Sequence, residues 1–239
     1  MTRALGFDNM DKRTQTEYPR TIRSFVTRAG RLTAGQERAL SQLWPKFGVA
    51  FEAKALDFDV TFGRSAPRVI EIGFGNGDHL LALAAAHPER DYLGVEVHRP
   101  GVGRLLLGIE KFALSNLRIV CHDAVAVLEQ QIALRSIDDI LILFPDPWHK
   151  KRHHKRRLIQ AAFVSILVER LKPGGHLRLA TDWQPYAEQM LAVLDADPQL
   201  QNVAGEERFM ARPERESTRF EVRGQRLGHA VWNLAYRRT

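Results

Sequence analysis

Apolar residues from position 68 onward follow two alternating spacings. Short apolar runs have the character of buried strands, and the segments between them carry apolar residues three or four positions apart, as amphipathic helices do. This alternation predicts an α/β fold with a mostly parallel sheet and helices on both faces. The expected strands are residues 68–73, 91–97, 117–123, 138–144 and 175–182. The expected helices are residues 77–88, 101–114, 124–134, 153–171 and 183–196.

The two ends of the chain are less regular. Residues 1–30 are polar, rich in Thr, Asp and Arg, and are expected to form an N-terminal arm, whereas residues 31–239 are expected to form a single domain. Thr33 and Gln36 have the spacing of a capping box that starts a helix over residues 34–44. Residues 230–236 have the pattern of a last strand.

Positive charge is concentrated in one segment. The chain has 35 Lys and Arg against 28 Asp and Glu, a formal net charge of +7. Six of the eight residues in Lys150–Arg157 are Lys or Arg, and none is acidic. Such a block suggests a polyanionic partner, nucleic acid before a membrane surface. The alternative is a solvated helix start, although cations there oppose the helix dipole.

Other features narrow the class of protein. The sole cysteine, Cys121, excludes an internal disulfide and a Cys-rich zinc site, and within a strand it is expected to be a small core residue. Cations surround His149, His153 and His154, and no acid or Cys joins them, so no metal is expected. Because no apolar run is long enough for a signal or membrane segment, a soluble cytoplasmic protein is expected, as a monomer or a homodimer.

A glycine-rich turn follows the first expected strand. The motif EIGFGNG places Gly73, Gly75 and Gly77 where the chain passes from strand to helix, so that a ligand can approach the backbone closely. The spacing is G-x-G-x-G, not the G-x-G-x-x-G of dinucleotide sites, because Asp78 occupies the last position. A carboxylate there repels a pyrophosphate, so the turn favours a ligand without phosphates.

Acidic residues stand at or beside the ends of three successive strands. Glu96 can accept hydrogen bonds from both hydroxyls of a ribose, and Asp123 can accept one from an adenine amino group. Each acid alone is equally compatible with an N-cap of the following helix. Together with Glu71 and the glycine motif, the series resembles class I S-adenosylmethionine-dependent methyltransferases, whose cofactor is cationic and carries no phosphate.

A narrower resemblance comes from FPDPWHKKRHHKRR and STRFEVRGQRLGHAVWNLAYRR, with RSFVTRAGRLTAGQ and LKPGGHLRLATDW. These segments resemble the bacterial tRNA (guanine-N7-)-methyltransferase family over a match from about residue 20 to the end of the chain. The resemblance implies the Rossmann-like class I methyltransferase fold, with about seven strands and an antiparallel last hairpin strand. It also implies methylation of N7 of guanosine 46 in the variable loop of tRNA, with S-adenosylmethionine as cofactor.

The resemblance assigns roles to matching positions. Cofactor contacts fall on Glu71, Glu96, Asp123 and Asp146, beside the glycines at 73, 75 and 77, and Asp146 is also the implied catalytic residue. Substrate contacts fall on Lys150, Asp182, Thr218, Arg219, Phe220 and Glu221. RNA contacts fall on Arg152, His153, His154, Lys155, Arg156 and Arg157.

Alternatives remain at several of these positions. Asp146 can stabilise the positive charge that moves to the base, or it can hold guanine through N1–H and the 2-amino group. Asp182 can read the base or cap the next helix. Phe220 and Trp148 can stack on a base or pack in the core. For the whole chain, the alternatives are a non-catalytic RNA-binding protein on a methyltransferase fold and a methyltransferase acting on another RNA base atom.

Overall fold

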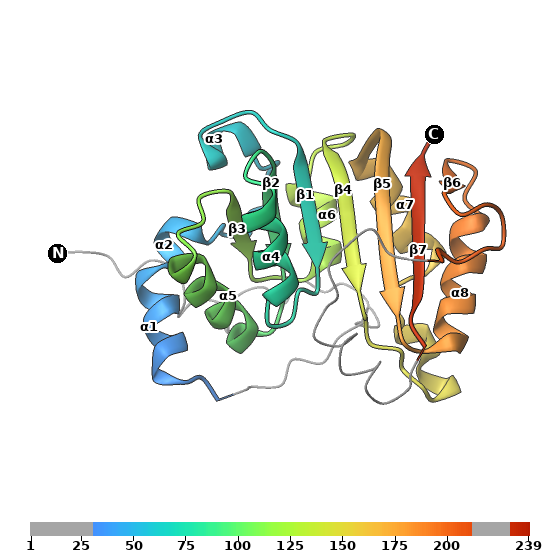
Figure 1. The fold of residues 1–239 in the computed structure, drawn as a ribbon, viewed down its shortest axis with the longest axis horizontal. Helices are drawn as coiled ribbons and strands as arrows, with labels where there is room; N and C mark the ends of the chain where they lie inside the picture. Colours follow the sequence, from blue (N-terminus) through green and yellow to red (C-terminus); the bar gives the residue numbers. More distant parts are fainter. Residues whose placement is uncertain (1–30, 212–229) are drawn as a thin grey trace.

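The computed structural model describes residues 31–211 and 230–239, which form one seven-stranded sheet with helices on both faces (Figure 1). The strands lie in the order β3-β2-β1-β4-β5-β7-β6. Strands β1 to β5 pair in parallel, and β7 runs antiparallel to both β5 and β6. The strands are β1 Arg68–Ile72, β2 Asp91–Val95, β3 Leu117–Val120, β4 Ile137–Leu143, β5 Leu171–Thr181, β6 Leu200–Asn202 and β7 Trp232–Arg238.

This topology confirms the predicted fold class. The five parallel strands fall where the apolar runs lie, and β7 is the antiparallel last strand expected near residues 230–236. The short strand β6 was not predicted, because its three residues are too few to set up a spacing. The arm expected at residues 1–30 lies outside the described residues.

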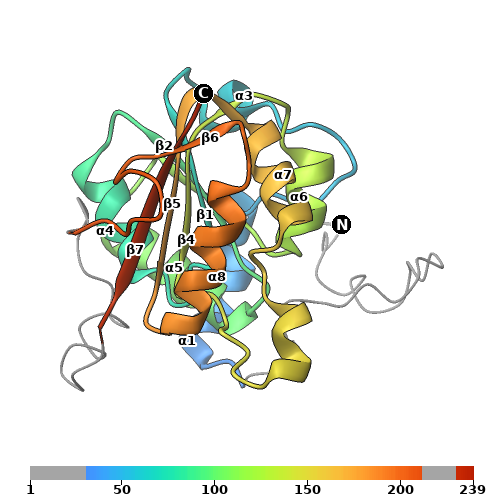
Figure 2. The ribbon, with the colours of Figure 1, turned by 90° about the vertical axis from the view of Figure 1, so that its right-hand side faces the viewer.

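The core has two layers, because successive side chains of a strand point to opposite faces of the sheet. Over one face, α1, α2, α4 and α5 pack against residues such as Val69 and Leu141. Over the other, α6, α7 and α8 pack against residues such as Ile70 and Ile140, as the edge-on view of Figure 2 shows. The helices are α1 Ala34–Gln42, α2 Trp44–Phe47, α3 Phe58–Phe62, α4 Asp78–Ala86, α5 Arg99–Lys111, α6 Ala124–Gln131, α7 Ala161–Arg170 and α8 Gln184–Asp195.

The single helix predicted over residues 153–171 is wrong. The structure has a short 3₁₀ helix, η1 Lys151–Arg156, followed by a break, and the α-helix begins only at Ala161. At Arg157 and Gln160 the backbone is not helical, with ψ angles of 135° and 157°. The basic residues are therefore not the first turn of a long helix, and the predicted conflict with a helix dipole does not arise. No helix within the described ranges is both long and apolar enough to cross a bilayer.

An ion-pair cluster forms around one buried carboxylate near the start of β4. The carboxylate of Asp139, on β4, is shielded from solvent and pairs with the guanidinium groups of Arg90 and Arg178. Arg90 precedes β2 and Arg178 lies on β5, so one anion joins three segments of the chain. A buried carboxylate is tolerated only with such partners.

We expect Asp139→Asn to lower the free energy of unfolding by roughly 3 kcal/mol, because it leaves two partly buried cations without the anion that they share. Urea denaturation checks this, with a lower midpoint and an unchanged slope. The matched control is Glu110→Gln. Glu110 pairs with Arg38 at 2.6 Å, but both side chains are more than 40% exposed (43% and 42%), so the loss should stay below about 1 kcal/mol. Equal losses in the two variants contradict the assignment.

Candidate active site

The glycine turn lies between β1 and α4, at the carboxyl end of β1. Gly73, Gly75 and Gly77 have φ angles of 73°, 58° and 79°, in the left-handed region that side chains disfavour. At Gly77 a Cβ atom would also come within 2.6 Å of the Leu105 side chain on α5. At Gly73 and Gly75 a Cβ would meet nothing within 4 Å. The turn is thus tightly packed where α4 begins and open in its first half.

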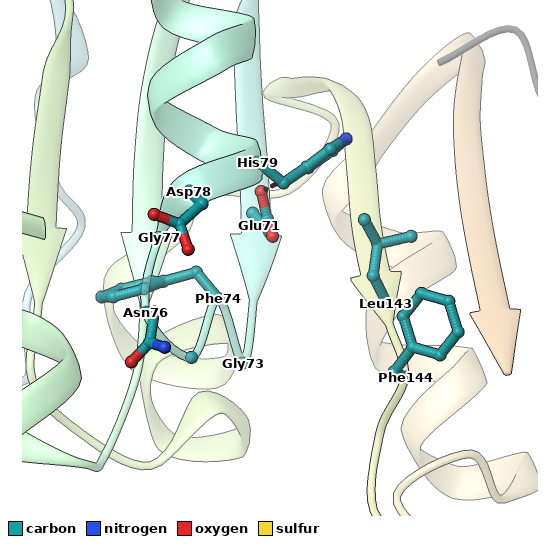
Figure 3. A pocket seen from close by; sticks show the side chains of 10 residues that line it. Glu71, Gly73, Phe74, Asn76, Gly77, Asp78, His79, Leu143 and Phe144 are labelled. Atoms are coloured by element: carbon teal, nitrogen blue, oxygen red, sulfur yellow. Dashed lines mark hydrogen bonds and ion pairs between the residues drawn. The ribbon is translucent and has the colours of Figure 1, made fainter. Parts of the chain in front are cut away.

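A cavity of about 210 Å³ opens beside this turn. Its walls are the turn itself, the first residues of α4, and Leu143 and Phe144 at the end of β4. Figure 3 shows Leu143 and Phe144 on one side of the view and the glycine turn with Glu71 on the other. The cavity therefore lies between the ends of two neighbouring strands, where ligands bind in parallel α/β sheets.

Glu71 lies on β1 and is only 3% exposed. One of its carboxylate oxygens lies 3.1 Å from Nδ1 of His79 in the first turn of α4, the contact drawn as a dashed line in Figure 3. An ionised Glu71 would accept this bond from Nδ1 of His79. The other ring nitrogen, Nε2, is buried and has no hydrogen-bond partner among the described residues. Sequence reasoning missed His79, since nothing in its spacing shows that it reaches a strand residue.

Glu96 directly follows β2 and fastens the glycine turn to it. Its Oε2 accepts a hydrogen bond from the backbone N–H of Gly75 at 2.9 Å. Its Oε1 accepts from the backbone N–H groups of Val97 and His98, at 2.7 and 3.0 Å. An ionised carboxylate has about four acceptor positions, so these three bonds leave capacity for a ligand hydroxyl.

Asp123 caps the helix after β3. Its Oδ1 accepts from the backbone N–H groups of Val125 and Ala126, at 2.8 and 3.4 Å. The N-cap alternative is therefore realised here, and both bonds use one oxygen, Oδ1. Nearby, Cys121 directly follows β3 instead of lying within it, and it is partly buried against the core. Burial raises the pKa of its thiol to about 11, which disfavours the reactive thiolate.

Asp146 projects from the irregular segment that follows β4 and is exposed. Phe144 and Trp148 flank it with φ angles of 54° and 45°, rare values for residues with large side chains. The rings of His149 in this segment and Trp183 after β5 meet edge to face at 4.4 Å. That contact holds the segment carrying Asp146 beside the one carrying Asp182.

Asp182 is exposed and does not cap α8. The N-cap of α8 is Trp183, and no side chain caps it. The capping alternative for Asp182 is wrong, which leaves its carboxylate available to a substrate. Of the other predicted substrate contacts, Lys150 is exposed at the start of η1, whereas Thr218–Glu221, with Phe220 among them, lie outside the described residues.

The basic segment Lys150–Arg156 lies on the surface. Lys150, Lys151, Arg152 and Lys155 are exposed, and His153 and His154 are partly covered. Desolvation and the surrounding cations lower the pKa of His153, which keeps its ring neutral at physiological pH. Within residues 31–211 and 230–239, no three His, Cys, Asp or Glu side chains come together to hold a metal ion.

Arg157 corrects the prediction of an RNA contact along the whole segment. Its side chain turns inward, is only 4% exposed, and bonds to the chain's own carbonyl and amide oxygens. A guanidinium in this position cannot reach a phosphate on the surface. The remaining predicted contacts, from Arg152 to Arg156, are accessible or partly accessible, and their role stays a prediction.

Comparison with known proteins identifies the family. A family model described as putative methyltransferase matches residues 65–234. A tRNA (guanine-N(7)-)-methyltransferase of Paraburkholderia xenovorans is 58% identical over 92% of this chain and 84% of its own. A protein of the same name from Alkalilimnicola ehrlichii is 56% identical over 92% of this chain and 93% of its own.

Solved structures share the fold at low sequence identity. The 16S rRNA methyltransferase KamB superposes with a TM-score of 0.55 at 15% identity, covering 77% of this chain and 95% of its own. TrmN from Thermus thermophilus gives 0.52 at 19% identity, over 73% of this chain and 45% of its own. With relatives above 50% identity over nearly the whole length, the chain belongs to the tRNA (guanine-N(7)-)-methyltransferase family.

Proposed function

We propose that this protein transfers a methyl group from S-adenosylmethionine to N7 of a guanosine in tRNA, guanosine 46 of the variable loop. The observation that carries the proposal is the cavity between the glycine turn and the end of β4, which opens beside the segment bearing Asp146. The names of relatives more than 50% identical to the chain supply the base and the RNA. We expect the enzyme to act in the cytoplasm, as a monomer or a homodimer, without a metal.

The residues around the cavity fit S-adenosylmethionine. The missing side chains of Gly73 and Gly75 leave open space, so a ligand can lie against the backbone there. Of the three carboxylates, Glu71 lines the cavity, while Glu96 and Asp123 lie beyond its walls, directly after β2 and shortly after β3. Together they suit a cationic nucleoside without phosphates. We assign Glu71 to its amino-acid end, Glu96 to its ribose and Asp123 to its adenine. When bound, the cofactor supplies an electrophilic methyl group on a sulfonium.

The chemistry at guanine requires orientation more than proton transfer. N7 has a lone pair and is not protonated at neutral pH, so no general base is needed before attack. The protein must place N7 in line with the methyl group and accommodate the positive charge that appears on the base. Asp146 is suited to this role because it is a carboxylate on the segment beside the cavity. Asp182 is suited to binding the guanine edge, because the contact between His149 and Trp183 holds its segment beside the one that carries Asp146.

The basic segment Lys150–Arg156 supplies phosphate contacts close to the base. It begins four residues after Asp146, so phosphates bound to it lie near the nucleotide that reacts. Phosphate contacts fix the register of an RNA, while contacts to the base edge select the guanine. The predicted contacts at Thr218–Glu221 belong to the same proposal.

We expect Asp146→Asn to reduce kcat for methyl transfer to unmodified tRNA by roughly 100-fold, because it removes a charge that stabilises the transition state. Radiolabelled methyl transfer measures kcat and KM, and mass spectrometry of digested tRNA locates the methyl on N7. A loss in kcat at constant KM supports charge stabilisation, whereas a rise in KM alone supports guanine positioning. Glu129→Gln, at an exposed position on α6, is the control. Full retention of transfer by a folded Asp146→Asn contradicts any role in catalysis.

We expect Glu96→Gln to weaken S-adenosylmethionine binding at least tenfold, since loss of one charge-assisted hydrogen bond costs about 1.5–3 kcal/mol. The amide would present a donor to one of the N–H groups that the carboxylate now accepts, and this loosens the glycine turn. Calorimetric titration with the cofactor gives the dissociation constant. The control is Glu89→Gln, whose side chain is 62% exposed. An unchanged dissociation constant in Glu96→Gln would remove Glu96 from the cofactor site.

A further inference from the structure

Arg157 differs from the rest of the basic block in its environment. No residue of η1 is buried, whereas Arg157, the next residue, is 4% exposed. Burying a guanidinium is unfavourable unless hydrogen bonds and aromatic faces replace its water. This desolvation lowers the pKa of Arg157 from its ordinary value, yet an arginine remains charged at neutral pH. The protein therefore keeps a cation buried at position 157 at a cost in free energy. The groups that Arg157 contacts indicate its role.

The partners of Arg157 come from the segment after β4, from α8 and from η1, where Nε2 of His154 lies 3.2 Å from Nη2 of Arg157. Its Nε donates to the backbone carbonyl of Pro147 at 2.8 Å. Its Nη1 donates to Oε1 of Gln189 on α8 at 2.6 Å. The guanidinium also lies over the ring of Tyr186, 4.8 Å from its centroid, and burial raises the pKa of that phenol to about 12, so the ring stays neutral. Arg157 thus connects the residue after Asp146 to a helix of the core.

The contact to Pro147 fixes a backbone that would otherwise relax. Trp148, the next residue, has a φ of 45°, which costs free energy for a residue with a side chain. The guanidinium of Arg156 lies over the Trp148 ring, 4.1 Å from its centroid, so two adjacent arginines hold two adjacent residues of the segment. Contacts from Arg156 and Arg157 thus hold the two residues that follow Asp146.

The anchor on α8 is rigid. Tyr186 is fully buried, and its hydroxyl accepts a hydrogen bond from the backbone N–H of Ile159 at 3.1 Å. Gln189 donates from Nε2 to the carbonyl of Ile159 at 3.1 Å while its Oε1 accepts from Arg157. The position of Pro147 is therefore set by a helix of the hydrophobic core and not by the surface segment alone.

We propose that Arg157 is a positioning residue that fixes the backbone at Asp146–Pro147 for methyl transfer, and that it makes no phosphate contact. The inference rests on the proposed function, because it assumes that Asp146 acts at the reacting base. It divides the basic block into two parts. The exposed cations Lys150, Lys151, Arg152 and Lys155 face the RNA, whereas Arg157, with Arg156 stacked on Trp148, orients the acidic segment next to the cavity.

The test compares Arg157→Gln with Arg152→Gln, which removes an exposed cation of the same block. We expect Arg157→Gln to lower kcat at saturating tRNA at least tenfold, while the dependence of tRNA affinity on salt keeps the wild-type slope. Arg152→Gln should reduce that slope by about 0.7, the contribution of one phosphate contact in a single-stranded segment. Arg38→Gln, on the surface of α1, controls for loss of an arginine elsewhere and should change neither quantity.

A second pair of variants decides the question if Arg157→Gln does not fold. Gln189→Leu and Gln189→Glu both lose the bond to Ile159, but only the glutamate still accepts from Arg157. We expect Gln189→Leu to lower kcat and Gln189→Glu to retain most of it, with equal tRNA affinity in both. A role in folding alone would not separate the two variants in kcat.

The outcomes are distinct. Wild-type kcat in a folded Arg157→Gln, or equal kcat in the two Gln189 variants, overturns the inference. A salt slope in Arg157→Gln as shallow as that of Arg152→Gln also overturns it, because the residue is then a phosphate contact. A wild-type protein that adds no methyl to guanine N7 overturns the proposed function itself.

Discussion

The parallel pairing of β1 with both β2 and β4 is the constraint on which the rest of the site depends. Glu71 is level with Gly94 on one side and Leu141 on the other, so the three strands end at the same edge of the sheet. Side chains far apart in the sequence therefore converge without any direct contact being required to bring them together. If the register of β4 slipped by one residue, the segment that follows it would be displaced from the glycine turn.

The acids at this edge are already fixed by the chain before any ligand arrives. Glu96 is bonded to three backbone N–H groups, Asp123 to the start of α6, and Glu71 to His79. Ligand binding then does not have to order these side chains, and this reduces the entropy that binding costs. Asp123 shows that a local cap and the proposed cofactor contact are compatible uses of one carboxylate, so a sequence cannot distinguish them.

Much of the sheet and of its acidic edge could be predicted from the sequence, because apolar spacing and strand ends are local properties. The part that failed depends on distant partners. Residues 153–171 have helical spacing, but Arg157 bonds to positions 10 and 32 residues away, and these contacts keep the chain extended between η1 and α7. His79 was missed for another reason: its partner Glu71 is only eight residues away, but nothing in the spacing shows that a residue of the first turn of α4 bonds back to β1. Likewise, the number of Lys and Arg residues in the basic segment cannot show that the side chain of Arg157 is the buried one.

Phe144 and Trp148 give the protein an unusual relation between stability and activity. Both adopt the left-handed backbone conformation, at a cost of about 1–3 kcal/mol each, on either side of an exposed carboxylate. Laboratory evolution that rewards heat resistance alone would favour glycine or asparagine at these two positions. Such variants would be more thermostable, but the segment between positions 144 and 148 would no longer be held in one orientation by the side chains of Phe144 and Trp148. Selection for thermostability therefore has to measure turnover at every round.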